Sequence, residues 1–450
     1  MNIARSRSIS RSKNLPFPKD IFLLGEFKSL VNSLVTRLGI AKRFKPRLYS
    51  YADFVFVKFY ALITSTPIER ASERLNNWLV LQYFNKYKLK PKNFQDGVRK
   101  RRLVPHQTDV DKFFRLLSEK EVNMLFGNLL MNVVLKVKAR CIGGSKLRFL
   151  VDNTEYAYYG KPNSLFEIGT NRKPGTRFCR MFQGHALHGS GMTLFTDFYL
   201  LQKGKYRCLN IPHSVEWIRW SGINLSYSLM DREFYRAALI KDLKTCKLPV
   251  LIPAKKYPGI KRKIKDFLLG IGPLVSVYHF SQTQKVKPWP SSVHVNFVVI
   301  GHKNVLATEI RRQFRQGILT FDEAIKQLAG FFTTLKPWKN HSRWAKWLSR
   351  AYKKRWNEET GFSKLNDIHK SFRNHYPNVQ LSQLYMRAII YNNWQYFKRE
   401  AEKSGIKASK RTLAVFLEIL EWRIYNLIEQ SVSYNLKYLQ KKRRRLYFES

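Results

Sequence analysis

The stretch KLRFLVDNTEY, residues 146–156, decides the fold of this chain. Its apolar run stops at an acid, which predicts a buried strand that ends at Asp152. Similar stretches rich in apolar, β-branched and aromatic residues follow, two of them around the turn sequence HGSG (188–191). We predict these further strands at 176–187 (TRFCRMFQGHAL), 192–201 (MTLFTDFYLL) and 223–230 (INLSYSLM), the last of which stops directly before Asp231.

The remaining pattern predicts an α/β (α+β) class. A short strand over 248–255, a hairpin with a Pro-rich tip over 274–301 and a strand over 330–335 are followed by helical sequence. We therefore expect a sheet region flanked by helical regions. The expected segments are a flexible basic arm (1–20), a helical region (21–140), a region of strands and helices (141–400) and a helical basic C-terminal region (401–450).

Helix start signals mark the N-terminal region. Thr66 precedes Pro67, with Glu69 three positions after the cap, and Ser118 stands three residues before Glu121. Basic segments such as RKRR (99–102) lie between the helices, as expected of a DNA-binding module. A helical packing domain with no DNA role is the alternative.

The charge balance points to a polyanionic partner. The 450 residues include 82 Lys and Arg against 31 Asp and Glu, a net charge of +51. Such self-repulsion disfavours a compact chain unless a polyanion relieves it, and Lys and Arg contacts to phosphates release counterions. Nucleic acid is the favoured partner, and a ribosome-associated or membrane-surface role is the alternative.

Cysteine usage and hydropathy bear on location. The four cysteines form no C-x-x-C pair and have no histidine at zinc-finger spacing, which disfavours a disulfide framework or a zinc site and fits a reducing cytoplasm. The longest apolar run, 54–64, is too short to span a bilayer, so we expect no membrane partner. The acid-free N-terminus is typical of a basic arm that contacts phosphates, although a transit peptide has similar composition.

Three acids carry the candidate chemistry. Asp152 and Asp231 each follow a predicted strand, and Glu359 lies on a late helix. Carboxylates in a phosphate-seeking protein favour Mg²⁺, and two such ions about 4 Å apart can clamp both oxygens of a phosphoryl displacement. The competing interpretation is that these acids are helix caps and surface ion pairs.

Residues 352–362, YKKRWNEETGF, give the third acid an unusual setting. On one continuous helix Tyr352, Arg355, Glu359 and Phe362 would share an arc of about 80°. That face would carry a carboxylate and a guanidinium between two rings. Packing of the helix on a sheet would explain the Tyr352 ring equally well, and it is the favoured explanation for Phe362.

Together these motifs resemble a family. The spacing of Tyr352, Arg355 and Glu359 is similar to the Y-(2)-R-(3)-E-(6)-K signature of one group of DDE transposases from bacterial and archaeal insertion sequences. FLVDNTEY resembles its first motif through Asp152 and Thr154, and LMDREFY resembles its second through Asp231, Arg232 and Phe234. The resemblance covers about residues 145–400.

The resemblance implies an RNase H-like fold, a mixed five-stranded sheet flanked by helices. It divides this region into a catalytic domain (141–245 and 328–400) and a β-rich insertion (246–327) before the glutamate. It also implies cleavage at transposon ends and strand transfer into target DNA by a homodimer in a synaptic complex, in the cytoplasm at the nucleoid. Asp152, Asp231 and Glu359 would be the catalytic residues and would bind two Mg²⁺ or Mn²⁺ ions. Tyr352, Arg355, Arg232 and Lys364 would contact DNA.

One departure keeps alternatives open. The signature expects a lysine at position 366, where this chain has Asn366, so Lys364 or Lys370 would have to substitute. An inactive transposon-derived DNA-binding protein, or a nuclease of the same fold without strand transfer, are therefore the rival functions.

Weaker signals lie elsewhere in the chain. Asp197 is the main rival of Asp231, although it lies within a predicted strand. His185 and His188 have a metal-like spacing but should point to different faces of a strand. Trp289 in the Pro-rich tip could contact a base or be an exposed turn residue.

Overall fold

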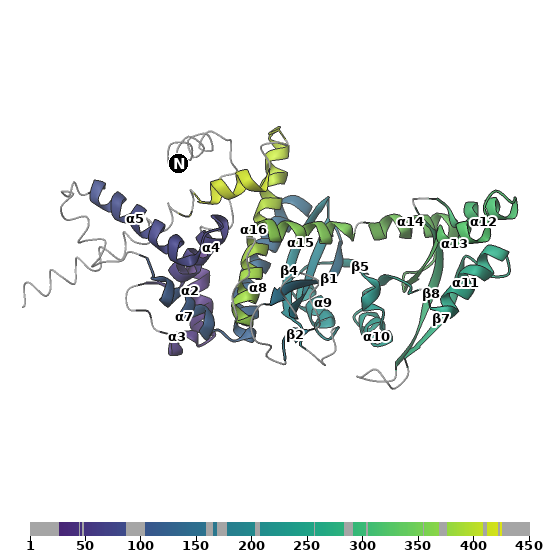
Figure 1. Ribbon diagram of the computed structural model, residues 1–450, viewed down its shortest axis with the longest axis horizontal. Helices are drawn as coiled ribbons and strands as arrows, with labels where there is room; N and C mark the ends of the chain where they lie inside the picture. The colour runs from purple at the N-terminus through teal and green to yellow at the C-terminus, as the bar shows by residue number, and fades with distance from the viewer. Residues whose placement is uncertain are drawn as a thin grey trace, which may run out of the picture. The chain divides into compact units, whose positions relative to one another are not determined.

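The structure is a computed structural model of the whole chain (Figure 1). It describes residues 27–44, 46, 49–86, 104–158, 165–168, 178–202, 208–255, 257–282, 291–302, 305–353, 355–368, 376–407, 412–421 and 424, without the side chains of 27, 79–86, 157, 167, 168, 282, 291 and 356–360. The predicted basic arm, the RKRR segment, Lys370, Trp289 and most of the C-terminal basic region lie outside the described residues. The described chain forms two compact units, 1–141 with 364–450, and 142–363, which we call unit 1 and unit 2.

Unit 1 is helical. Its helices are α2 (Phe27–Arg37), α3 (Ile40–Arg43), α4 (Tyr51–Ile63), α5 (Ile68–Lys86), α7 (Gln107–Leu116), α8 (Glu119–Val137), α16 (Pro377–Lys403) and residues 413–421. The predicted starts of α5 and α8 are confirmed. At α8, the Ser118 hydroxyl accepts from the Glu121 N–H, and the Glu121 carboxylate accepts from the Ser118 N–H at 2.8 Å. This reciprocal cap satisfies two backbone donors that the first turn leaves unpaired.

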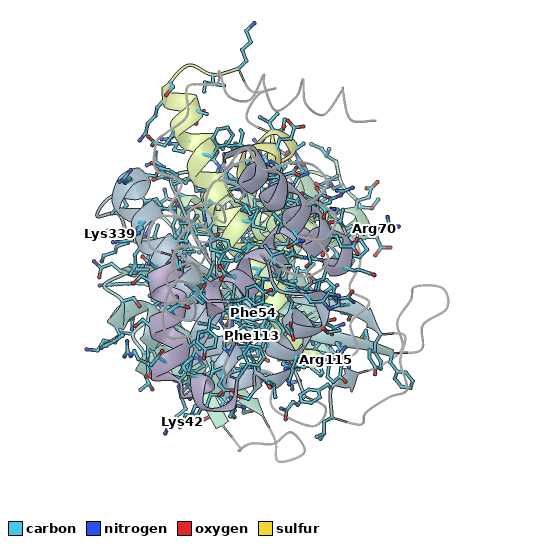
Figure 2. All side chains as sticks on the ribbon, turned by 90° about the vertical axis from the view of Figure 1, so that its left-hand side faces the viewer. Lys42, Phe54, Arg70, Phe113, Arg115 and Lys339 are labelled. Carbon is cyan, nitrogen blue, oxygen red and sulfur yellow. The ribbon has the colours of Figure 1, made fainter. Side chains whose placement is uncertain are left out.

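An aromatic core holds unit 1 together. Phe54 of α4 and Phe113 of α7 are fully buried, with ring centroids 5.6 Å apart. Figure 2 shows both rings among the helices, with Lys42 and Arg70 at the periphery. α8 is long and apolar enough to cross a membrane by length and composition, yet more than half of that window is buried in the structure. α8 packs on α16, so within the described chain it is a core helix.

Unit 2 is built on a nine-stranded mixed sheet. Its strands are β1 (Leu147–Tyr158), β2 (Glu167–Ile168), β3 (Phe178–Gly189), β4 (Met192–Leu200), β5 (Leu225–Met230), β6 (Val250–Pro253), β7 (Val275–Gln282), β8 (Ser291–Gly301) and β9 (Leu328–Thr333). The order is β2-β3-β1-β5-β6-β9-β8-β7, and β4 pairs with β3 beside β2. β3 runs antiparallel to both β4 and β1, while β1, β5 and β6 run parallel. These five strands form the mixed sheet of an RNase H-like fold, which confirms the predicted fold class.

The sheet differs from the prediction in two respects. It is larger than five strands, because β9 pairs with β6 and carries β8 and β7 beyond it. β1 also continues for six residues beyond Asp152, because its antiparallel ladder with β3 runs on to Tyr158. Asp152 therefore ends only the parallel ladder with β5, whose last pair is Val151 with Met230.

Helices cover both faces of the sheet. Those of unit 2 are α9 (Asn210–Trp220), the 3₁₀ turn η2 (Arg232–Phe234), α10 (Ala237–Thr245), α11 (Pro258–Leu269), α12 (Ala307–Arg315), α13 (Phe321–Lys326), α14 (His341–Lys353) and the first half of α15 (Trp356–Ile368). The segment 246–327, expected to be a β-rich insertion, holds three of these helices as well as β6, β7 and β8. α16, expected within 328–400 of the catalytic domain, packs on α8 and α7 of unit 1.

Candidate functional site

Two of the predicted site acids are neighbours in the sheet. Val151 of β1 pairs with Met230 of the parallel strand β5, and Asp152 and Asp231 are the next residues of these strands. Adjacent strands lie about 4.8 Å apart, so the backbones of the two acids are side by side. Leu150 pairs with Leu229, which places both acids on the same face of the sheet. Both side chains are half-buried.

The backbone after each acid orients its carboxylate. Asp152 Oδ1 accepts from the Asn153 N–H at 2.9 Å, and Asp231 Oδ1 accepts from the Arg232 N–H at 2.7 Å. Asp231 is also the N-cap of η2, the short turn that ends β5. Charge-assisted bonds of this kind hold a carboxylate in one rotamer. Both acids therefore present a fixed carboxylate on this face.

A side-chain hydrogen bond joins the two strand ends. The Asn153 amide donates to Glu233 Oε1 at 2.9 Å, which ties β1 to the η2 turn. Behind it, the buried Gln183 donates to Asn153 Oδ1 at 3.4 Å. We call the Asn153–Glu233 bond the clasp. Because Glu233 is two residues from Asp231, the clasp restrains the spacing of the two site acids.

The third motif lies on two helices, and the prediction of one continuous helical face was wrong. α14 ends at Lys353, α15 begins at Trp356, and the Arg355 N–H bonds to the Tyr352 carbonyl three residues back at 2.9 Å. Arg355 therefore lies in a turn between the helices. Tyr352 stands in the last turn of α14, whereas Glu359 and Phe362 belong to α15.

The turn brings Arg355 to the first acid. Arg355 is 6% exposed, and its Nη1 lies 3.8 Å from Asp152 Oδ2. It also lies over the Tyr352 ring, 5.5 Å from its centroid. A buried cation at this distance supplies a counter-charge to the Asp152 carboxylate.

Both rings of the motif pack on the sheet. Tyr352 contacts Phe331 of β9 with centroids 4.9 Å apart, and the buried Phe362 meets Phe195 of β4 at 5.0 Å. A Cβ built on Gly184 would lie 2.4 Å from Phe362 Cζ, so only a glycine leaves room for this ring.

The contact with Gly184 also locates the third acid. Gly184 is the residue opposite Asp152 in the β1–β3 ladder, so Phe362 holds α15 beside the first acid. Glu359 stands three residues, about 4.5 Å along the helix axis, before Phe362. The side chain of Glu359 lies outside the described residues.

The residue types present fit a hard divalent cation. Asp152 and Asp231 offer oxygen ligands on one face, and Mg²⁺ is usually held by one or two carboxylates together with phosphate oxygens. Among the residues searched, which exclude the Glu359 side chain, no group of three or more His, Cys, Asp or Glu is arranged to hold a metal ion. In this structure the Arg355 guanidinium is a positive charge beside the Asp152 carboxylate, where a bound metal ion would also be placed.

Asp197 lies in a separate buried cluster. Its Oδ1 is 3.1 Å from His185 Nδ1 and accepts from the Thr196 hydroxyl at 2.8 Å, while its Oδ2 accepts from Ser214 of α9. Burial raises the pKa of Asp197, but His185 and the two hydroxyl donors outweigh it, and the net pKa is lowered. His185 pairs with Val151, so the cluster faces the side of the sheet opposite Asp152. His188 bonds to Thr193 instead.

The remaining predicted DNA contacts are placed separately. Arg232 is exposed on η2, next to Asp231. Lys364 pairs with Asp367 at 2.8 Å on an exposed part of α15 that belongs to unit 1, and Asn366 lies on the same helix. The sequence reasoning missed the clasp and the buried cluster. For Glu233, the sequence signal was its place two residues after Asp231, directly after the predicted strand.

Comparisons of sequence and structure relate this chain to known proteins. A search of curated protein sequences gives no significant match. Among solved structures, one similar chain is a piggyBac transposase from a cryo-EM synaptic complex with hairpin DNA, with 11% identity, a TM-score of 0.44, and coverage of 94% of this chain and 83% of that one. The family model described as "Transposase DDE domain" matches residues 149–393, more than half of the sequence, from β1 through both acids and α15 into α16. By this match the chain belongs to the DDE transposase domain family.

Proposed function

We propose that this chain is an active transposase that cuts DNA at transposon ends and joins the freed 3′-hydroxyl to target DNA. The observation that carries the proposal is the pairing of Val151 with Met230, which sets Asp152 and Asp231 side by side. The packing of Phe362 over Gly184 adds support, because it holds the helix that carries Glu359 beside Asp152.

In this proposal Asp152, Asp231 and Glu359 hold Mg²⁺ or Mn²⁺, as two ions. Bound there, the cations would supply Lewis-acid stabilisation of the charge that develops on the phosphodiester oxygens. Arg355 moves its counter-charge from Asp152 to the phosphate, where its planar fork suits bidentate contact. Tyr352, Arg232 and Lys364 contact the DNA near the cut.

The partners follow from the same proposal. Terminal repeats and target DNA are the two double-stranded substrates, and a homodimer holds two ends in a synaptic complex. The helical segment 21–140 and the basic ends of the chain would bind DNA outside the cut site, in the cytoplasm at the nucleoid. The division into a catalytic domain (141–245 and 328–400) and an insertion that contacts DNA (246–327) stays a proposal, except that β6 belongs to the catalytic sheet and α16 packs with unit 1.

The test is cleavage of duplexes made from the inverted repeats that flank the coding sequence. Purified protein with Mg²⁺ should release 3′-ends, and Asp152→Ala and Glu359→Ala should not. If either variant cuts as fast as the parent, the assignment of the three acids is wrong. A second assay with pre-cut ends and target DNA measures joining.

Asn366 favours the second candidate, a DNA-binding protein of transposon origin without catalysis, because the expected lysine charge is missing. That candidate requires tight, salt-sensitive DNA binding with no metal-dependent product, so any nicking that needs Mg²⁺ excludes it. A nuclease that cuts but never joins pre-cut ends would be the third outcome.

A further inference from the structure

α14 separates charge from apolar surface completely. Arg343, Lys346, Arg350 and Lys353 recur at steps of three and four, so they share an arc of about 80° on the helix. The opposite side carries the buried side chains Trp344, Ala345, Leu348 and Ala351. We call the four cations the α14 stripe.

The segment that carries the stripe contains no acid. No Asp or Glu occurs between Thr334 and Asn357. Within the part of the chain that the structure describes, Arg343, Lys346 and Arg350 form no ion pair.

On α12 and α16, exposed cations pair with acids of the same helix. Arg399 bonds to Glu402 and Lys403 to Glu400 on α16, and Arg312 bonds to Glu309 on α12. Those pairs are the arrangement expected of a solvated helix face. On α14, Arg343, Lys346 and Arg350 depart from this arrangement, and a row of solvent-accessible cations on a helix without acids is suited to an external anion.

An aromatic ladder extends the cationic surface beyond the helix. The ring centroid of Trp338, in the loop before α14, lies 5.4 Å from that of Trp347. The Trp347 centroid lies 5.7 Å from that of Tyr227 in β5. Arg148 Nε donates to the Tyr227 hydroxyl at 2.7 Å. The ladder anchors the loop, so the exposed Lys336 and Lys339 on either side of Trp338 prolong the stripe.

The other end of the stripe leads to the candidate site. Lys353 is two residues before Arg355, whose guanidinium lies 3.8 Å from Asp152. From Arg343 to Lys353 the helix rises about 15 Å, which corresponds to about four base pairs of duplex DNA. The cations of α14 are thus spaced to contact successive phosphates of one DNA strand as far as the acids.

We propose that the α14 stripe binds phosphates of duplex DNA on one side of the phosphodiester bond that is cut at Asp152 and Asp231. We call this binding surface the track. The position of that bond rests on the proposed function, but binding by the stripe does not require catalysis. The contact is with phosphates, so it adds affinity and register without base specificity.

The test compares two triple variants that lose the same charge. Arg343→Gln/Lys346→Gln/Arg350→Gln removes three stripe cations. Lys241→Gln/Lys244→Gln/Lys247→Gln removes three exposed cations from α10 and the residues after it. α10 packs beside α9, and α9 covers the face of the sheet opposite α14. Affinity for terminal-repeat duplex is measured in EDTA over a range of salt concentrations.

The stripe variant should bind at least about tenfold more weakly and lower the log–log salt slope by roughly 2 to 3, at about 0.9 per phosphate contact. It should also lose protection of about four consecutive phosphates beside the cut in a footprint. The α10 variant should keep the parental slope and footprint. Equal slopes in the two variants, whether parental or lowered, would overturn the proposal.

Two further variants separate this proposal from catalysis. Arg350→Gln alone, expected to lower the slope by about 1, serves if the triple variant does not fold. Asp152→Asn should retain the parental slope and footprint while cleavage is lost. A parent that binds through the stripe but never cuts contradicts only the proposed catalysis. A stripe variant that binds like the parent, with a parent that cuts, contradicts only the track.

Discussion

Unit 2 places two acidic clusters on opposite faces of one sheet, and they are built in opposite ways. Asp152 and Asp231 stand on the face that carries α14, half-buried, each with Oδ1 bonded to the next backbone N–H. Asp197 stands on the face that carries α9, 2% exposed, with both oxygens engaged by His185, Thr196 and Ser214.

The difference shows what makes an acid available as a ligand. The oxygens of Asp197 are saturated by donors away from water, so a cation there would have to displace buried hydrogen bonds. Asp152 is half-buried at the end of the parallel β1–β5 ladder, and its Oδ2 lies 3.8 Å from Arg355 Nη1, longer than a hydrogen bond. We therefore expect the first cluster to govern catalysis and the second to govern stability.

The largest expected effect is on cleavage. Asp152→Asn or Asp231→Asn keeps side-chain volume and a capping oxygen but removes the ligand charge. Cleavage should fall about a thousandfold or more, equivalent to about 4 kcal/mol in the barrier. Single-turnover cleavage of terminal-repeat duplex measures it, with unfolding midpoints as the control. Parental cleavage in either variant would remove that acid from the site.

The next effect is on folding. Asp197→Ala leaves His185 and Ser214 buried without their acceptor, which should lower the free energy of unfolding by about 3–5 kcal/mol. Urea denaturation followed by circular dichroism measures this loss. Asp231→Asn is the matched control and should change the same quantity by less than about 1 kcal/mol, because asparagine also caps a turn. Equal losses in the two variants would remove the distinction between the clusters.

The pH dependence of stability sharpens the same contrast. The pKa of Asp197 is lowered in the folded chain from its ordinary value of 3.8. Its carboxylate therefore stabilises the fold at pH values above 3.8, and this stabilisation is lost as the pH falls through the pKa of the folded state. The parent should lose more stability between pH 5 and pH 3 than Asp197→Asn does. Urea midpoints across this range test it, and parallel profiles in the two proteins would refute the assignment.

Much of this fold could be predicted, because the strands follow short apolar runs that end at turn residues or acids. The DDE motif order likewise led to the family that the sequence match supports. The helix break before Arg355 could not be predicted. Residues 352–357, YKKRWN, contain neither Gly nor Pro, so no local signal interrupts the helical pattern. The break is specified by tertiary packing of Tyr352 on Phe331 and of Phe362 over Gly184.

The buried cluster escaped prediction for a different reason. The turn at Ser190–Gly191 pairs Ala186 with Phe195, and the simple continuation would set His185 opposite Thr196. One extra residue on β4 instead sets His185 opposite Asp197. A shift of one residue exchanges the two faces of a strand, so this bulge decides that Asp197 faces His185. Nothing in the local sequence marks it.

The smallest effect tests whether the clasp positions the site. Asn153→Ala removes the hydrogen bond from Asn153 to Glu233, which is worth about 1 kcal/mol, so cleavage should fall about fivefold. The Mg²⁺ concentration for half-maximal cleavage should rise, because Asp231 is no longer held at its spacing from Asp152. Glu233→Gln keeps an acceptor for the Asn153 amide and should behave like the parent.

Asn378→Ala, which removes amide hydrogen bonds to carbonyls in unit 1, is the control for a purely structural loss. It should lower the unfolding midpoint without moving the Mg²⁺ dependence of the remaining activity. If Asn153→Ala behaves in the same way, the clasp only stabilises the sheet. If Glu233→Gln loses as much activity as Asn153→Ala, the charge of Glu233 acts at the site directly. Glu233 would then be a third functional acid beside Asp152 and Asp231.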